Sequence, residues 1–212
     1  MPTTLAIFDL DGTLADSLPW FRRHVNDVAD RFGFRRVGED DIEPLRRMGP
    51  REILEHLGVP RWKVPMIARH MRRLKAAHIG DIPLFPGVDA MLRAVRDGGV
   101  RLALVSSDHE ANARRQLGDA NAALFSDFAC GAALFGKAVK FRRVVRRAGV
   151  DPVGVIAIGD EVRDIEAARA AGIACAAVTW GYAAPETLRG LRPDLMFERM
   201  EDIAPRLLLS GA

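Results

Sequence analysis

The feature that most constrains this chain is a short apolar run near its amino terminus that ends in two aspartates. Residues Leu5–Phe8 are all apolar, and Asp9, Asp11, Gly12 and Thr13 follow within five positions. Four apolar residues bounded by turn formers are typical of a strand buried on both faces of a parallel sheet. In such sheets, ligands bind beyond the carboxyl ends of the strands, where these carboxylates would lie. The run therefore predicts an α/β fold with an acidic site at the end of its first strand.

The two aspartates stand two positions apart. Asp9 and Asp11 share one face of the chain if the backbone stays extended between them, because side chains alternate along an extended segment. Two like charges that lie close together need a metal ion or a shared proton. Carboxylate oxygens suit Mg²⁺. The alternative is an ordinary Asp-Gly turn after a strand, which this stretch alone does not exclude.

Length and composition indicate a globular protein with one large domain, or one domain with an insertion. The chain has 212 residues, of which 49% are hydrophobic and 28% charged, enough to build a sizeable core. The net charge is only +3, and the abundant arginines are spread along expected helices. We interpret them as solvated helix faces rather than a nucleic-acid surface, because no aromatic residues are interleaved with them.

The cysteines and the chain start bear on the cellular compartment. Cys130 and Cys175 have neither metal-ligand spacing nor the pattern of a disulfide framework, which indicates buried thiols in a reducing compartment. The first residues lack a basic region followed by a long apolar run. No segment approaches the ~20 apolar residues that a membrane span needs. We expect a soluble, cytoplasmic protein without a membrane partner.

Helices, and no strand, are expected between Gly12 and Leu84. Apolar residues at three- and four-residue steps predict a helix over 20–32 that ends at Gly33. Further helices are expected over 40–48, 50–57 and 61–79, with Gly and Pro between them. We therefore predict that residues 17–84 form an inserted helical cap domain. Residues 1–16 and 85–212 would form the core domain.

Strand and helix signals alternate over the rest of the chain. Strands are expected over 101–106, 128–130, 153–158, 173–178 and 195–197. Helices are expected over 88–96, 112–117, 137–148, 162–171 and 200–209. This alternation predicts a doubly wound parallel sheet that is covered by helices on both faces.

A second expected strand also ends in acids. Asp160 follows the run that ends at Gly159, and Glu161 and Asp164 come directly after it. Asp160 would meet Asp9 across one crevice, while Asp164 would favour the positive end of the next helix. Asp160 or Glu161 capping that helix is the alternative. Two acidic strand ends in one sheet favour a shared metal site.

A third strand end and one helix start carry candidate phosphate-binding groups. Ser106 and Ser107 follow the strand over 101–106, where hydroxyl and backbone N–H groups can hold anionic oxygens. A serine helix cap is the alternative. Lys137 opens a helix, where a cation is disfavoured unless it balances carboxylates or a phosphate. Lys140 is its rival for that role. His109 lies close enough to the serines to be a weaker candidate for substrate contact.

These motifs together resemble the four motifs of the haloacid dehalogenase superfamily of hydrolases. The first motif is resembled by the stretch Asp9-Leu10-Asp11-Gly12-Thr13-Leu14, and the second by Ser106. The third is resembled by Lys137 and the fourth by the stretch 159–164. The order and spacing agree over nearly the whole chain. The helical insertion is similar to the small cap of the phosphoglycolate phosphatase-like branch, whose core is Rossmann-like. The stretches 178–182 and 185–186 also look like that branch.

The resemblance implies a set of roles. Asp9 would attack the phosphorus and form an aspartyl-phosphate, while Asp11 would act as general acid and then as general base. Mg²⁺ would be held by Asp9, Asp160 and Asp11, the last through its backbone carbonyl. The phosphoryl group would be bound by Thr13, Ser106, Ser107 and Lys137. Glu161 and Asp164 would orient the metal-bound waters and Lys137.

The implied activity is Mg²⁺-dependent hydrolysis of a small phosphorylated metabolite by a monomer or homodimer. Asp11 favours a phosphate ester over a carbon–halogen bond, because only an alcohol leaving group needs an acid. Gly136-Lys137-Ala138 departs from the Lys-Pro form common in phosphoglycolate phosphatases, which speaks against phosphoglycolate itself. A phosphomutase is one alternative. A catalytically idle binding or regulatory module is another, although such a module has no need for both aspartates.

The cap offers further candidates for substrate contact at a predicted helix–helix turn. These are Arg47, Met48 and Arg51, and a solvated helix corner is the alternative interpretation.

Overall fold

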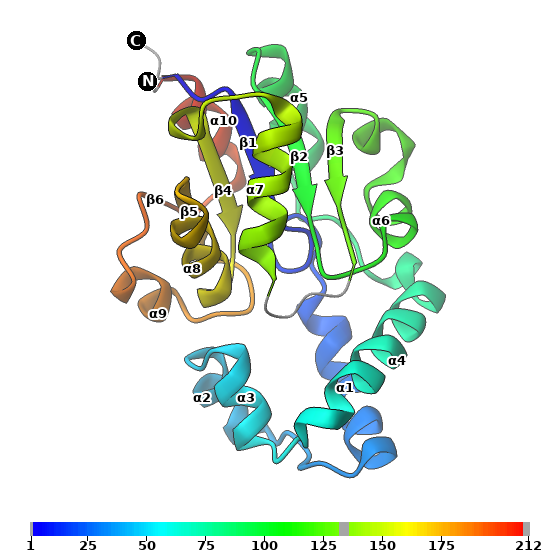
Figure 1. Cartoon of the computed structure of the whole chain (residues 1–212). Coiled ribbons are helices and arrows are strands. Elements are labelled where there is room, and N and C mark those ends of the chain that lie inside the picture. The colour runs from blue at the N-terminus through cyan, green and yellow to red at the C-terminus, as the bar shows by residue number, and fades with distance from the viewer. Residues whose placement is uncertain (1, 132–135, 210–212) are drawn as a thin grey trace.

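A six-stranded sheet runs through the centre of the protein, with strand order β3-β2-β1-β4-β5-β6 (Figure 1). The computed structural model describes residues 2–131 and 136–209. The strands are β1 (Leu5–Phe8), β2 (Arg101–Val105), β3 (Phe125–Ala129), β4 (Val155–Gly159), β5 (Ala174–Val178) and β6 (Leu195–Phe197). Every neighbouring pair is parallel. The predicted doubly wound parallel sheet is confirmed.

Helices pack against both faces of the sheet and bury alternate side chains of each strand. Ala6 and Phe8 of β1 pack into one core, while Leu5 and Ile7 pack into the other. The helices that pack on the first face include α5 (Val88–Asp97) and α10 (Ile203–Leu209), and those on the second include α7 (Lys137–Ala148) and α8 (Val162–Ala171). Burial on both faces explains why the strands are continuously apolar runs.

The strand order creates a switch point at the carboxyl end of β1. The chain passes from β1 to β2 and β3, and then returns to form β4 on the other side of β1. At such a reversal the crossover helices diverge to opposite faces and leave a crevice beyond the strand ends. Asp9 follows β1 and Asp160 follows β4, so both carboxylates lie at this crevice.

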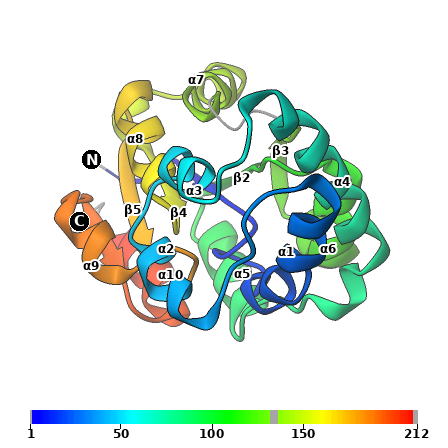
Figure 2. The ribbon, with the colours of Figure 1, turned by 90° about the horizontal axis from the view of Figure 1, so that it is seen from below.

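Residues 17–84 form a helical segment beyond the carboxyl ends of the strands (Figure 1). Its helices are α1 (Leu18–Phe32), α2 (Ile42–Arg46), α3 (Pro50–His56) and α4 (Val64–Ala77). Figure 2 shows α1 beside α4 on one side, with α2 and α3 together on the other. As predicted, this segment contains no strand.

The two connections between the helical segment and the sheet run side by side. The Asp16 amide donates to the Pro83 carbonyl, and the Phe85 amide donates to the Leu14 carbonyl, each at 2.9 Å. The chain thus leaves and re-enters the sheet region at one place, next to Asp9 and Asp11. The division into domains over 1–16 with 85–212 and over 17–84 stays a prediction.

Several predicted boundaries were wrong, each for a local reason. β4 begins at Val155 rather than 153, because the Asp151 side chain accepts the Val153 amide and starts a 3-10 turn. β3 spans 125–129 rather than 128–130, since the exposed Ser126 interrupts the apolar pattern. Helix α6 (Glu110–Ala122) is longer than predicted, with a kink at Gly118, and helix α9 (Pro185–Gly190) was not predicted. The last predicted helix starts with a 3-10 turn and becomes α10 at Ile203.

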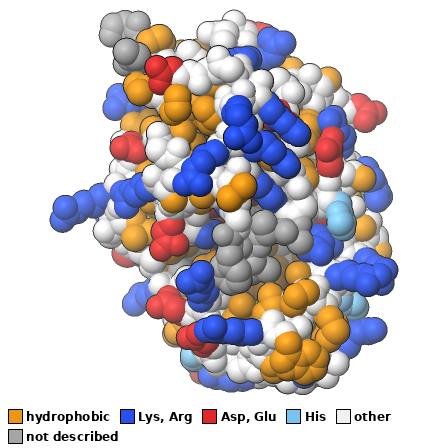
Figure 3. Space-filling view, in the orientation of Figure 1, with side chains coloured by type: hydrophobic (Ala, Val, Ile, Leu, Met, Phe, Trp, Pro, Cys, Tyr) orange, Lys and Arg blue, Asp and Glu red, His pale blue; other side chains and the backbone are white. Residues whose placement is uncertain are grey.

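The surface and the cysteines partly match expectation. Arg142, Arg146 and Arg147 on α7 are exposed, and Figure 3 shows basic side chains gathered over this helix. Cys175 is buried and Cys130 is half-buried, and neither forms a disulfide. Within residues 2–131 and 136–209, the helices are all too short or too polar to cross a membrane.

Candidate active site

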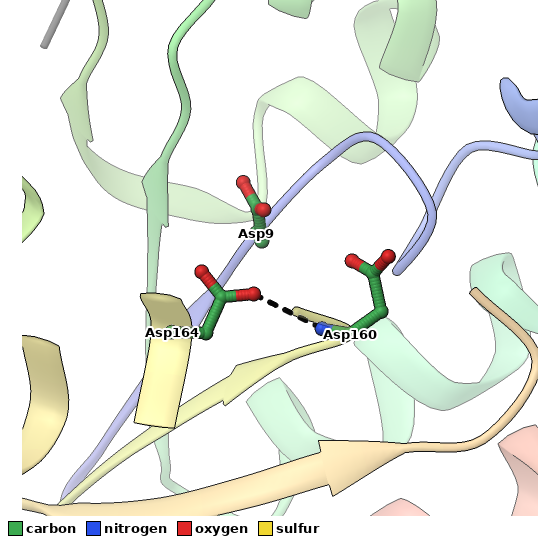
Figure 4. Close-up of side chains that lie close together, drawn as sticks. All are labelled: Asp9, Asp160 and Asp164. Carbon is green, nitrogen blue, oxygen red and sulfur yellow. Dashed lines mark hydrogen bonds between the residues drawn. The ribbon is translucent and has the colours of Figure 1, made fainter. Parts of the chain in front are cut away.

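Three buried aspartates meet at the switch point of the sheet (Figure 4). One carboxylate oxygen from each of Asp9, Asp160 and Asp164 lies within 4.8 Å of the other two. Asp9 comes from the end of β1, Asp160 from the end of β4, and Asp164 from the first turn of α8. All three donors are hard oxygen ligands, so the set suits a divalent cation such as Mg²⁺. The structure groups Asp164, rather than the carboxylate of Asp11, with Asp9 and Asp160.

Lys137 balances part of this negative charge. Its Nζ lies 2.8 Å from Asp9 Oδ2 and also donates to Asp164 Oδ1. This pairing explains why a lysine occupies the first turn of α7, where the helix dipole disfavours it. Lys140 faces different partners, because its Nζ donates to the carbonyls of Ser106 at 2.7 Å and Gly131 at 2.5 Å.

Asp160 is fixed by two hydrogen bonds to its carboxylate. The Thr13 hydroxyl donates to Oδ1 at 2.8 Å, and the Tyr182 amide donates to Oδ2 at 2.8 Å. The Asp160 and Glu161 amides in turn donate to Asp164 Oδ2 at 3.1 and 3.0 Å. Asp164 therefore accepts the free amides at the start of α8, and the carboxylate of Asp160 is not used as a helix cap.

Glycines leave room for these carboxylates. A Cβ at Gly12 or Gly181 would overlap the Asp160 side chain, and a Cβ at Gly159 would overlap Asp164. Gly12 also has φ of +78°, a conformation that L side chains rarely adopt. The glycine in the first motif is therefore required both for the turn and for the approach of Asp160.

We expect Gly12→Ala to lower the free energy of unfolding by about 3 kcal/mol, because the new methyl group meets both backbone strain and the Asp160 carboxylate. Gly172→Ala is a matched control, since Gly172 has φ of +74° but nothing within 4 Å of an added Cβ. That variant should lose only about 1 kcal/mol. Urea unfolding of both variants measures the difference. Equal losses would contradict the proposed overlap with Asp160.

Burial strongly affects the charges in the site. Burial raises the pKa of Asp9 above its ordinary value, although Lys137 opposes this effect. Burial and the neighbouring carboxylates raise the pKa of Asp160 well above its ordinary value. Asp164 behaves oppositely: burial acts against its charge, but Lys137 and Arg163 hold its pKa below the ordinary value. The protein alone thus leaves Asp9 and Asp160 short of positive charge, which a bound cation would supply.

Asp11 forms an ion pair with a residue that the sequence analysis did not single out. Lys75, a buried residue of α4, donates to Asp11 Oδ1 at 2.6 Å and lies 3.1 Å from Asp108 Oδ2. Asp108 is buried as well, and its Oδ1 accepts hydrogen bonds from the His109 amide and the Asn112 side chain. Lys75 looks like any helix lysine in the sequence, so only the packing of α4 against the sheet region brings it to Asp11.

The other phosphate-binding candidates lie around the same crevice. Ser106 is buried, and its Oγ accepts the Asp108 amide at 3.1 Å, while Ser107 is half-buried. The Thr13 hydroxyl donates to Asp160 and is thus engaged within the protein. Glu161 pairs with Arg163, the distance from Oε1 to Nη2 being 2.5 Å. The roles predicted for Ser106, Ser107, Thr13 and Glu161 therefore stay predictions.

The candidates for substrate contact lie partly at the surface and partly at a cavity. His109, which directly precedes α6, is exposed, and so are Arg47 and Arg51. Met48 lines the cavity described below. The residue that the sequence did not single out is Arg46, which donates to the Tyr182 carbonyl at 3.1 Å and the Gly181 carbonyl at 3.3 Å. Arg46 thereby holds α2 against the loop that contacts Asp160.

A cavity of about 410 Å³ extends from the crevice into the helical segment. Asp11, Lys75, Ser107, Asp108 and Glu161 line the end of the cavity near the sheet. The walls farther from the sheet come from α1 to α4 and their connections. The site therefore combines a crevice whose carboxylates can bind a metal ion with a chamber that can receive a small molecule.

Comparison with known proteins gives the family. A family model described as "Haloacid dehalogenase-like hydrolase" matches residues 6–178. The chain belongs to this family. The resemblance found in the four motifs is thereby confirmed.

Similar proteins extend over nearly the whole chain. A phosphoglycolate phosphatase from Synechococcus elongatus is 33% identical over 198 residues, which cover 93% of each chain. Phosphoglycolate phosphatase 1 from Pseudomonas aeruginosa is 27% identical over 95% of this chain and 78% of its own. A haloacid dehalogenase-like family hydrolase from Streptococcus pneumoniae has a similar fold, with a TM-score of 0.80 at 21% identity over 96% of this chain and 98% of its own.

Proposed function

We propose that the protein is a Mg²⁺-dependent phosphatase that hydrolyses a small-molecule phosphomonoester through an aspartyl-phosphate on Asp9. The observation that carries this proposal is the position of Asp9: its carboxylate ends β1 at the switch point, contacts Lys137 and lies beside Asp160 and Asp164. Similarity to proteins named phosphoglycolate phosphatase supports phosphate-ester chemistry.

The reaction has two steps. In the first, an Asp9 oxygen attacks the phosphorus, the ester P–O bond breaks, and the departing oxygen takes a proton from Asp11. In the second, Asp11 takes a proton from water, and the resulting hydroxide attacks the phosphorus and releases Asp9 and phosphate. Lys75 donates to Asp11 Oδ1, so it fixes the orientation of this carboxylate.

The surrounding groups would hold the phosphoryl group and the cation. Asp9, Asp160 and the Asp11 carbonyl would hold Mg²⁺, which when bound offsets phosphate charge and orients the phosphoryl group. Thr13, Ser106, Ser107 and Lys137 would contact the phosphoryl oxygens. Glu161 and Asp164 would orient the metal waters and Lys137.

The helical segment 17–84 would act as a cap over the reaction. Lys75 and Arg46 connect its helices α4 and α2 to Asp11 and to the loop at 181–182. A segment held over the strand ends excludes bulk water from the first step and selects the leaving group. We infer that both contacts form in the closed state.

We expect the purified protein to release phosphate from an aryl phosphate with Mg²⁺ and to lose this activity in EDTA. Mg²⁺ should also raise the melting temperature, because binding at 100 times its dissociation constant contributes about 2.7 kcal/mol. Phosphate release and thermal unfolding over a Mg²⁺ titration measure both effects.

Two variants test the proposed metal site: Asp160→Asn changes the site, and Asp127→Asn is the control. Asp160→Asn removes a proposed ligand and should abolish both the activity and the Mg²⁺-dependent rise in melting temperature. Asp127 lies on β3, away from the site, and pairs with Arg147 of α7, so its variant should keep both the activity and the Mg²⁺-dependent rise in melting temperature. Conversion of a hexose 1-phosphate to an isomer without free phosphate would instead indicate a phosphomutase. Phosphate binding without turnover of any ester would favour a binding module.

A further inference from the structure

The walls of the cavity are mainly apolar, and the apolar side chains come from all four helices of the segment. Within the segment, half-buried side chains line this space instead of filling it, and Figure 3 shows hydrophobic side chains at the surface over these helices. The half-buried wall residues include Phe21, Leu45, Ile53, Ile67, Ala68 and Met71. The helical segment thus lines a chamber with mainly apolar walls that is continuous with the crevice at Asp11.

Most cations at the cavity wall already have acidic partners. Lys75 pairs with Asp11 and Asp108, and Arg163 pairs with Glu161. Arg22 and Arg46 pair with Glu39 and Glu43. Among the cavity-lining cations, Arg72 alone has no ion pair with a residue in the described part of the chain. Among the described residues, a charged leaving group would therefore find Arg72 as the one cation without an acidic partner, next to a wall that is mainly apolar.

We propose that the leaving group of the substrate carries an apolar body, an alkyl chain or an aromatic ring, that occupies this chamber. This inference rests on the proposed phosphatase function. A polar body would give up its hydration without gaining partners from the apolar wall, which is unfavourable. An apolar body gains from leaving water, and about 410 Å³ lies within the size range of small-molecule sites.

The test compares straight-chain alkyl phosphates from ethyl to hexyl, with phosphoglycolate as the charged ester of two-carbon size. The alkyl esters have leaving groups of nearly equal acidity, so the chemical step is matched along the series. Each methylene buried in the chamber should raise kcat/KM about fourfold. We expect hexyl phosphate to exceed ethyl phosphate by on the order of 100-fold, and to exceed phosphoglycolate as well.

A matched pair of variants locates the effect in the chamber. Ala68→Phe adds a ring to the chamber wall of α4, whereas Ala77→Phe adds the same ring at an exposed position outside the chamber on the same helix. Ala68→Phe should lower kcat/KM for hexyl phosphate at least tenfold and leave ethyl phosphate within about twofold. Ala77→Phe should change neither value. The alkyl series on the unmodified protein tests the proposal even if Ala68→Phe fails to fold.

The possible outcomes separate this inference from the proposed function. Hydrolysis of no ester, the aryl ester included, would overturn the proposed function itself. Hydrolysis of ethyl and hexyl phosphate at equal kcat/KM would leave the phosphatase proposal standing and overturn the apolar leaving group. A preference for phosphoglycolate that is lost in Arg72→Gln would also overturn it, by showing that the chamber binds a carboxylate.

Discussion

Asp9→Asn is expected to reduce phosphate release by on the order of 10⁴-fold or more, as removal of a nucleophile does in other hydrolases. The amide is nearly isosteric with the carboxylate but cannot attack phosphorus at a useful rate. Asp9 is also one of three buried acids, so its neutralisation removes repulsion from Asp160 and the fold should persist. Steady-state phosphate release with saturating Mg²⁺ measures the loss, and circular dichroism verifies the fold.

The appropriate control changes an aspartate at another strand. Asp127→Asn makes the same substitution on β3, where Asp127 pairs with Arg147 instead of facing the crevice. Its activity should stay within about twofold of the unmodified protein, because no group in the crevice changes. Metal-dependent activity that survives in Asp9→Asn would contradict the assignment of Asp9 as nucleophile.

The sheet could be predicted because its strands are buried on both faces. Continuous apolar runs such as Leu5–Phe8 and the glycines that end helices carry this information locally. Gly33 adopts positive φ at the helix end where it was expected, and Gly149 and Gly172 do so directly after α7 and α8. Boundaries were wrong where a single side chain decides the local structure, as Asp151 does before β4. Such competition between a side chain and the backbone pattern is not visible in hydrophobic periodicity.

The acidic part of the site could also be predicted, because it depends on the topology of a parallel sheet. Asp9 and Asp160 had to meet once β1 and β4 were adjacent, and Lys137 and Asp164 lie in the first turns of helices at that edge. Lys75 could not be predicted in the same way, since α4 reaches Asp11 only through the packing of helices far apart in sequence. The apolar chamber depends on that packing too.

Lys137→Met is expected to lower kcat/KM by about 10²- to 10³-fold, the usual effect of removing one group that stabilises transition-state charge. The substitution also leaves Asp9 and Asp164 without their shared cation. Loss of one partner from a buried ion pair costs about 3 kcal/mol of unfolding free energy, less where an aspartate takes up a proton. Lys140→Met, by contrast, removes only donations to the carbonyls of Ser106 and Gly131 and should reduce activity less than about tenfold. Activity assays and urea unfolding of the two variants measure the contrast.

The pH dependence of activity provides a second test that distinguishes the two lysines. Burial lowers the pKa of Lys140 to about 8, whereas Asp164 and Asp9, against the effect of burial, raise the pKa of Lys137 above its ordinary value. Raising the pH from 7 to 9 therefore removes the charge of Lys140 and leaves that of Lys137. If Lys137 binds the phosphoryl group, activity should persist above pH 8. A fall through pH 8 that disappears in Lys140→Met would assign the role to Lys140, because only its charge is lost in that range.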